Sequence, residues 1–489
     1  MKKMILFWAT AMALIACQRE SEEIPPPLKP TPKEEVGLIN APDDPSLKWV
    51  ALTENYYISE KEAQDLALKF AQQTQSIEKK QGVSLFSKED ALEVESIMTV
   101  KNTSNYSTFC RAVTSEQNDL YIVNFKNSKG FVLTSADKRI PGIFAYSDKG
   151  HWEENTSNPI QKILYEQLLQ YIDLNRSLFE ERKDKLAQEA LESFTKDLPK
   201  QEKERLFKKY FDEKGKLKSN IARSVSFDPD DPDCIQGTDY EVFYDDWELV
   251  NETNVLLKTE WDQIGGYNSI VKNNNCSSGR TPVGCVAVAV GQIMAYHKKP
   301  AVFNGRLIHW DEMTASPSIN FVSLQGREDI QHLLADLGNK EFLSINYTCD
   351  RSGASDENAL STFKKLGYAN AILSDKYDIE KNLLANRPVY ISAVDKPRYD
   401  RTREGHAWVI DGYKKYRASW KEVIYVECRE KIYKSYVYVS LIHHNLGWGS
   451  GSNLWYRPEL THSNSKKVFG NYPKMDRFPY DIKVITNIY

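Results

Sequence analysis

The sequence predicts an α+β fold in which helices are segregated from an antiparallel sheet. Strand-like runs, rich in β-branched and aromatic residues, recur in the C-terminal half of the chain. They cover residues 388–394, 406–413, 422–428 and 435–445. By contrast, a run of small and apolar residues follows Cys285 without a break until Pro300, which is typical of a buried helix.

The composition is that of a globular protein. The 489 residues leave room for two or three domains of roughly 100–200 residues each. Hydrophobic residues make up 41% of the chain and charged residues 27%. Because the 64 basic and 68 acidic residues nearly cancel, we expect no polycationic surface and no nucleic-acid partner.

The N-terminus has the layout of an export signal. Two lysines precede an apolar run from Met4 to Ala16, which is too short to span a bilayer. The four residues that end at Cys17 (LIAC) resemble the lipobox of bacterial lipoproteins, in which the cysteine is lipidated. We therefore expect a signal peptide over residues 1–17, a Pro-rich tether over 18–45, and a lipid-anchored protein of the outer membrane or cell surface, or one secreted after processing. An ordinary cleaved signal is the alternative.

A folded unit is expected over residues 46–225. Ser59 and Glu62 have the spacing of a capping box ahead of an amphipathic helix. Two strand-like runs within residues 120–136 predict a hairpin. Apolar positions at helical spacing within residues 160–172 predict a helix that packs against it.

A break between two domains is predicted near residues 220–235. The charged, helical segment 183–218 precedes it, and Asp-Pro clusters mark it. With Lys218 and small residues around it, such an exposed segment favours proteolytic nicking, although a plain linker is the alternative. The second domain, residues 235–489, is expected to open with helices and to continue as a sheet.

Cys285 is the candidate nucleophile. It follows Gly284 at the predicted first turn of the buried helix, where unpaired N–H groups and the helix dipole lower a thiol pKa. The alternative is a small core cysteine. His406, which follows Gly405 at a junction of loop and strand, is the candidate base that such a nucleophile requires.

Two further side chains complete a candidate acyl-transfer site. Asn445 would accept a hydrogen bond from the His406 imidazole and fix its orientation, with Trp448 as a shield from water. Gln263 would donate to the developing oxyanion together with the backbone N–H of Cys285. Taken singly, Asn445 is also a typical turn residue and Gln263 a typical surface residue.

The other cysteines do not predict a metal site. They show no CxxC pairs and no regular spacing, so we expect neither a metal nor an organic cofactor, and the sequence leaves any disulfide pairing open. The six cysteines after the signal are Cys110, Cys234, Cys276, Cys285, Cys349 and Cys428.

Taken together, these segments resemble the streptopain family of papain-like cysteine peptidases. The segments LLKTEWDQ, VGCVAVAVGQIMAYHKKP and GHAWVIDGY, and the Asn-to-GWG loop, occur in the family's order. The resemblance implies a papain-like domain with a helical and an antiparallel-sheet subdomain. It implies Cys285 as nucleophile, His406 as base, Gln263 as oxyanion donor and Asn445 as support for the histidine. Leu446 departs from the family's usual tryptophan, so the shielding role would pass to Trp448.

Residues 119–141 resemble the inhibitory propeptide of the same family. The resemblance implies an α+β propeptide domain and a zymogen whose own propeptide is its inhibitor. Cleavage is expected between about Lys214 and Asp233. Protein or peptide substrates would be hydrolysed through a Cys285 thioester.

Two rival functions stay open at this point. A transglutaminase or amidase would pair Cys and His with an Asp, for which Asp411 is the candidate. Its odd offset from His406 along a strand places it on the opposite face. The second rival is a catalytically weak surface lipoprotein that uses a peptidase-like scaffold to bind protein.

Overall fold

The protein is described by a computed structural model. It describes residues 46–80, 92–101, 118–140, 142–153, 156–219, 226–227, 235–374, 379–394, 404–449, 451–457 and 482–489. The predicted signal peptide, Cys17, the tether and most of the predicted linker lie outside these ranges, as do Cys110 and Cys234. No helix within these ranges has the length and apolar character needed to cross a membrane.

Four of the described helices, α2, α3, α8 and α9, begin at a side-chain cap. At the start of α2, the Ser59 N–H donates to Glu62 Oε2 at 2.7 Å and the Glu62 N–H donates to Ser59 Oγ at 3.2 Å, so the predicted capping box is confirmed. The helices are α1 (Leu47–Thr53), α2 (Glu60–Lys80), α3 (Pro159–Phe194), α4 (Lys200–Tyr210), α6 (Cys285–His297), α7 (Trp310–Met313), α8 (Leu324–Leu337), α9 (Asp356–Lys365) and α10 (Ile379–Leu384), with the short 3-10 helices η3 (Lys126–Ser128) and η4 (Ile319–Phe321).

In the described part of the chain, eleven strands form one antiparallel sheet, with the order β1-β2-β3-β4-β16-β15-β14-β13-β17-β12 and with β7 paired beside β14. Its strands are β1 (Val94–Val100), β2 (Leu120–Phe125), β3 (Phe131–Ser135), β4 (Ile143–Ser147), β7 (Thr238–Thr253), β12 (Ile372–Ser374), β13 (Val389–Val394), β14 (Gly405–Val426), β15 (Arg429–Asn445), β16 (Leu454–Tyr456) and β17 (Lys483–Thr486). Short two-stranded pairs join β5 (Ser226–Phe227) to β6 (Ile235–Gln236), β8 (Val302–Phe303) to β9 (Arg306–Leu307), and β10 (Asn346–Tyr347) to β11 (Ser352–Gly353). The α+β class and the predicted hairpin, formed by β2 and β3, are confirmed.

Three predictions about the length or order of helices and strands were wrong. The runs 406–413 and 422–428 belong to one strand, β14, because the residues between them pair with β7 on one side and β15 on the other. The C-terminal part opens with β7 rather than with helices. The predicted helix over 160–172 continues through α3 to Phe194, so the charged segment 183–218 is the end of α3 followed by α4.

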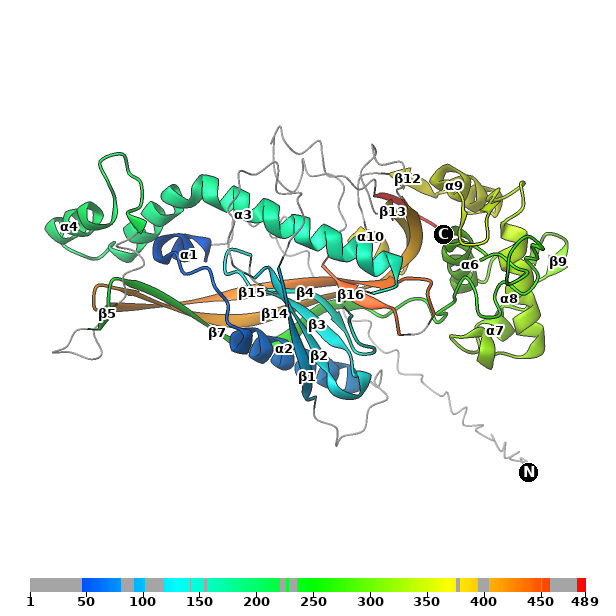
Figure 1. The fold of residues 1–489 in the computed structure, drawn as a ribbon, viewed down its shortest axis with the longest axis horizontal. Coiled ribbons are helices and arrows are strands. Elements are labelled where there is room, and N and C mark those ends of the chain that lie inside the picture. Colours follow the sequence, from blue (N-terminus) through cyan, green and yellow to red (C-terminus); the bar gives the residue numbers. More distant parts are fainter. Residues whose placement is uncertain are drawn as a thin grey trace, which may run out of the picture. The chain divides into compact units, whose positions relative to one another are not determined.

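The helix α3 covers one face of the sheet, and α6 covers the other face of β13 and β14. Figure 1 shows α3 running along β14 and β15. Ile391 and Trp408 belong to the core that α3 closes, whereas Ala407 and Val409 belong to the core around α6. Strand alternation thus divides the buried residues 407–410 of β14 between these two cores, and this indicates where the neighbouring candidate site residues point.

Candidate active site

Cys285 is the first residue of α6, as predicted, and its side chain is buried. The preceding Gly284 has φ +95°, and a Cβ there would lie 2.8 Å from the carbonyl oxygen of Ser352, so glycine is required on both counts. The other supporting glycine, Gly405, opens β14, and a Cβ there would meet Val394 only at an ordinary 3.7 Å.

The environment of the thiol differs from the prediction. Burial raises the pKa of Cys285 above its ordinary value, although the backbone N–H groups of Ala407 and Val286 favour the thiolate; the charge of Asp356 raises the pKa further. The prediction of a lowered pKa was wrong for this form, because the cost of desolvating the thiolate exceeds the help from the helix N-terminus.

The pairing of β14 places His406 and its neighbour Ala407 on opposite faces of the strand. His406 pairs directly with Ala393, and Ala393 and Trp408 both belong to the core that α3 closes. The next residue, Ala407, faces the core that contains Cys285. Because neighbouring residues of a strand point to opposite faces, this form directs the imidazole toward α3 and away from the thiol.

Asn445 is buried and bound to two other segments. Its Oδ1 accepts from Gln292 Nε2 at 3.1 Å, and its Nδ2 donates to the Thr259 carbonyl at 2.7 Å. Gln292 lies on α6, and its Oε1 accepts from the Trp261 N–H at 3.0 Å. Gln292 was not among the predicted site residues, although an amide within an otherwise apolar helix is a signal for a buried polar contact. The predicted bond from His406 to Asn445 is not among these contacts and stays a prediction.

Gln263 lies beside the nucleophile segment in a bend, as predicted. Its carbonyl oxygen accepts from the Val283 N–H at 3.0 Å, two residues before Cys285. Its N–H donates to Asp262 Oδ1 at 2.5 Å. Burial raises the pKa of Asp262, although the N–H groups of Gln263 and Ile264 favour its charged form. The bond between Gln263 and Val283 thus holds Gln263 beside the segment that leads into Cys285.

The Gly-Trp-Gly loop packs on the start of α6. A Cβ at Gly447 would lie 3.0 Å from Val288 Cγ1. Leu446 is fully buried, and the half-buried Trp448 packs against the same core, which α3 closes. Trp448 and His406 are therefore on the same side of the sheet in this form.

Asp411 has a partner other than His406. His443 Nδ1 lies 2.6 Å from Asp411 Oδ1, and both side chains are buried. The neighbouring His444 accepts from Trp408 Nε1 at 2.8 Å, so the two histidines meet different partners, as expected on a strand. A register shift at Asp411 interrupts the alternation on which its predicted face depended. The pair with His443 removes the geometric basis for a Cys-His-Asp site that includes Asp411.

A disulfide closes the loops near the nucleophile. Cys276 is bonded to Cys349, which lies in the turn between β10 and β11. Ser352, whose carbonyl approaches Gly284, is on β11 of the same hairpin. Among the cysteines within the described ranges, Cys285 is the free thiol.

Comparison with known proteins agrees with this arrangement. Residues 261–456 match the peptidase C10 family, and residues 55–172 match the Spi protease inhibitor family. Streptopain from Streptococcus pyogenes is 25% identical over 395 residues, which cover 73% of this chain and 80% of that protein. A thiol protease/hemagglutinin from Porphyromonas gingivalis is 30% identical over 183 residues, or 31% of this chain and 20% of that protein.

A solved fragment of prointerpain A from Prevotella intermedia is similar over 82% of this chain and 99% of the fragment, at 17% identity and a TM-score of 0.44. The two family matches carry the assignment: one supplies the peptidase and the other the inhibitor that precedes it. The chain therefore contains a peptidase C10 domain, the domain of the streptopain family, preceded by a Spi-type propeptide inhibitor domain, and it is a cysteine-type peptidase.

Proposed function

We propose that the chain is an exported cysteine endopeptidase, made as a zymogen, with Cys285 as nucleophile and His406 as general base. The observation that carries the proposal is the free thiol of Cys285 at the first residue of α6, with the backbone N–H groups of Ala407 and Val286 beside it. Export and a lipid anchor at Cys17 rest on the N-terminal sequence.

The reaction proceeds in two half-reactions. The His406 imidazole takes the proton from Cys285 Sγ, and the thiolate attacks the carbonyl carbon of a peptide bond. The Cys285 N–H and the Gln263 side-chain amide donate to the oxyanion. The imidazolium then protonates the leaving amine, and a thioester forms. Water, deprotonated by His406, hydrolyses the thioester and regenerates the thiol.

The inactive state follows from the face on which His406 lies. In the form described, α3 closes the core on that face, and the imidazole is directed toward it. Activation requires the imidazole to reach the face of Cys285 and to meet Asn445. We infer that departure of the propeptide, after cleavage between about Lys214 and Asp233, permits this movement. Lys214 lies at the start of that segment, most of which is outside the described residues.

The test uses residues 18–489 at neutral pH with mild reductant. Wild type should shed roughly the first 220 residues and gain iodoacetamide-sensitive casein hydrolysis, whereas Cys285→Ala and His406→Ala should stay intact and inert. His332→Ala, a half-buried histidine on α8, is the matched control and should behave as wild type. If an externally trimmed wild type cleaves no protein and Cys285 resists alkylation, the chain is instead a binding scaffold.

A further inference from the structure

The long helix α3 continues beyond the part of the chain that resembles known inhibitors. The inhibitor match ends at residue 172 and the peptidase match starts at residue 261, so the second half of α3 and all of α4 lie between the two. These helices, together with α1, pack on the far end of the hairpin formed by β14 and β15. We call α1 together with residues 178–210 the clamp, and residues 422–433 the hairpin tip.

The contact between clamp and tip has an apolar centre. Ile424 and Val426 of the tip are fully buried in one core with clamp side chains. The ring of Trp49, on α1, lies 5.0 Å from the ring of Tyr433. Clamp residues in this core include Leu47, Trp49, Phe179, Leu186, Leu191 and Phe194. Apolar area of this kind is the main source of binding free energy between protein surfaces.

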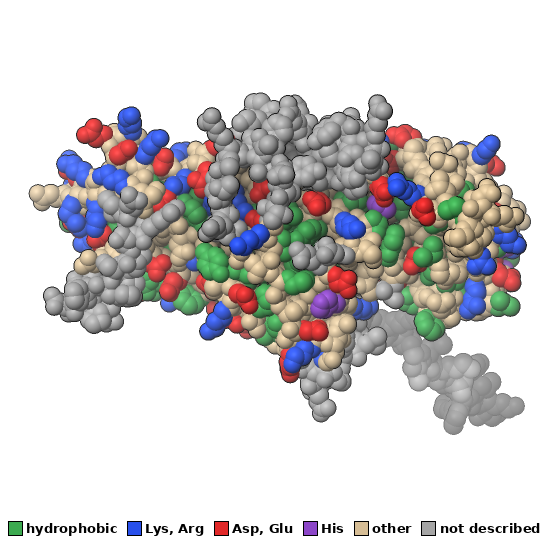
Figure 2. Space-filling model, in the orientation of Figure 1, with side chains coloured by type: hydrophobic (Ala, Val, Ile, Leu, Met, Phe, Trp, Pro, Cys, Tyr) green, Lys and Arg blue, Asp and Glu red, His purple; other side chains and the backbone are tan. Residues whose placement is uncertain are grey.

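Charged pairs surround this centre. Lys209 Nζ lies 2.6 Å from Glu427 Oε1, and Tyr210 also donates to Glu427. Arg429 pairs with Glu202 at 3.1 Å, and Lys431 pairs with Asp197 at 3.2 Å. Figure 2 shows Lys and Arg side chains gathered at the end of the molecule where Figure 1 places α4. The matching of charges across the contact fixes its register.

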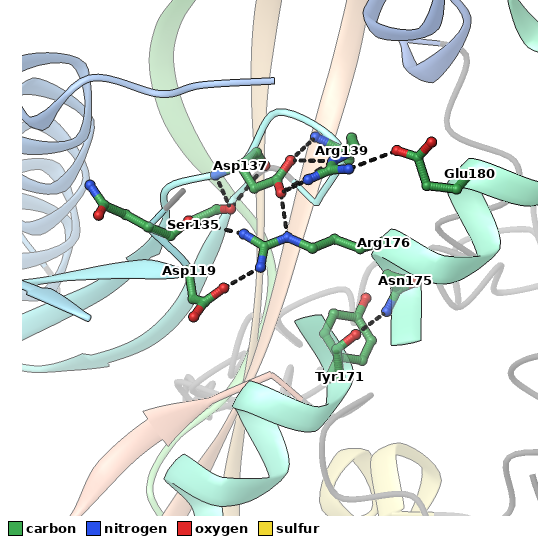
Figure 3. A network of polar contacts seen from close by, with 9 residues as sticks. Asp119, Ser135, Asp137, Arg139, Tyr171, Asn175, Arg176 and Glu180 are labelled. Carbon is green, nitrogen blue, oxygen red and sulfur yellow. Dashed lines mark hydrogen bonds and ion pairs between the residues drawn. The ribbon is translucent and has the colours of Figure 1, made fainter. Parts of the chain in front are cut away.

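A buried charge network joins α3 to the segments that flank the hairpin of β2 and β3. Figure 3 shows Arg176, on α3, between Asp119 and Asp137 of the segments that flank β2 and β3. Arg139 pairs with Asp137 at 2.7 Å and with Glu180 of α3 at 2.9 Å. Since breaking such a buried charge network is costly, the hairpin of β2 and β3 should move together with α3 as one rigid body.

We propose that the hairpin tip is a second binding site for the propeptide, apart from the candidate active site, and that it keeps the propeptide bound after the chain between residues 219 and 235 is cut. The clamp and the tip contain no residue of that segment, so cutting it removes none of the contacts described above. The inference rests on the proposed zymogen, and it adds that cleavage alone does not activate the enzyme. Activation needs a second event that opens the clamp.

The experiment uses the full chain with Cys285→Ala and a recognition site for an added protease placed within residues 221–234. Because Cys428 of the tip is disulfide-bonded, the cut fragments are first reduced; they are then diluted to nanomolar concentration, and their dissociation rate is measured with one fragment immobilised on a surface. Wild-type fragments should stay together for hours. Trp49→Ala should raise the dissociation rate at least about tenfold, since a buried aromatic contact of a few kcal/mol is lost.

A charge reversal in the Lys431–Asp197 pair tests the contact at the hairpin tip without removing a buried apolar side chain. Lys431→Glu should raise the dissociation rate several-fold, and adding Asp197→Lys should restore it. Lys434→Glu, an exposed residue of the same strand on the alternate face, is the matched control and should change nothing. Melting of each uncut chain verifies that it is folded.

Equal dissociation rates for all variants, or immediate separation of the wild-type fragments, would overturn the second site. Because the assay uses the inert Cys285→Ala chain, its failure would leave the proposed peptidase reaction standing. Failure of the peptidase would likewise leave this result intact.

Discussion

Gln292 Nε2 donates to Asn445 Oδ1 across 3.1 Å, and both side chains are buried. The other three contacts of this pair run to the backbone, at the Trp261 N–H, the Thr259 carbonyl and the Gly447 N–H. These bonds fix which atom of the Asn445 amide faces α6. Only one orientation presents Oδ1 as an acceptor, and an imidazole that reaches Asn445 needs that acceptor.

Gln292→Glu should therefore lower kcat/KM by about 10- to 100-fold, because a misplaced supporting group disturbs the reacting geometry. The carboxylate can still accept from the Trp261 N–H, but it repels Asn445 Oδ1. Gln331→Glu is the control: it loses a comparable donor bond, to the Gly266 carbonyl at 2.9 Å, away from Asn445. The pH profile of kcat/KM should change for Gln292→Glu alone. Equal profiles for both variants would contradict a positioning role.

Alkylation of Cys285 in the intact chain should require alkaline pH. Burial raises the pKa of this thiol above its ordinary value of 9.0, and only the thiolate reacts with iodoacetamide. In the His406→Ala chain, which cannot process itself, the reaction rate should rise with a midpoint above pH 9.0. Asp356→Asn removes a charge that raises the pKa, so its midpoint should fall. A midpoint below about pH 8 in the His406→Ala chain would contradict the burial of the thiol.

Acid should destabilise the protein through His444. Burial, followed by repulsion from His443, lowers its pKa from 6.5 to about 3. The unfolded chain binds a proton below about pH 6.5 that the folded chain refuses, so stability falls between pH 6.5 and about 3. His444→Gln keeps an acceptor for Trp408 and should flatten that part of the urea-unfolding profile. His151→Gln, at a half-exposed histidine, should leave the slope unchanged.

Asp137→Asn should lower the free energy of unfolding by about 3–5 kcal/mol, because it leaves buried guanidinium groups without their counter-charge. Burial alone would raise the pKa of Asp137, but Arg139 and Arg176 hold it below its ordinary value, so this stability is lost as the pH falls through that lowered pKa. Urea unfolding of the full Cys285→Ala chain measures the change. Asp246→Asn, in an exposed pair with Lys69, should leave the free energy of unfolding nearly unchanged. Similar losses for both would refute the network.

Local signals were enough for the elements next to the nucleophile. The helix that begins at Cys285 and the capping box of Ser59 and Glu62 can be predicted because the deciding residues are neighbours in the chain. The same holds for the hairpin of β2 and β3. Gln263 can be placed near Cys285 only by family resemblance, since the Val283 bond that positions it spans twenty residues.

Elsewhere, features that depend on partners distant in sequence could not be predicted. The uninterrupted β14 depends on β7, which precedes it by more than 150 residues and supplies the pairing for its polar middle. The bond from Gln292 to Asn445 spans 153 residues, and the Cys276–Cys349 bridge spans 73. The face of His406 depends on which helix covers the sheet, and no periodicity within its strand reveals that.

The strand β16 has β15 on one side and β4 on the other, where Trp455 pairs with Tyr146 and Tyr456 pairs with Ala145. In any form of the protein that has lost residues 46–219, β16 becomes an outer strand with bare backbone donors and acceptors. Unpaired edge strands of this kind can pair with strands of other molecules. The propeptide strand β4 thus covers a sheet edge that the mature enzyme would expose, so association between copies would be easier for the mature enzyme than for the zymogen.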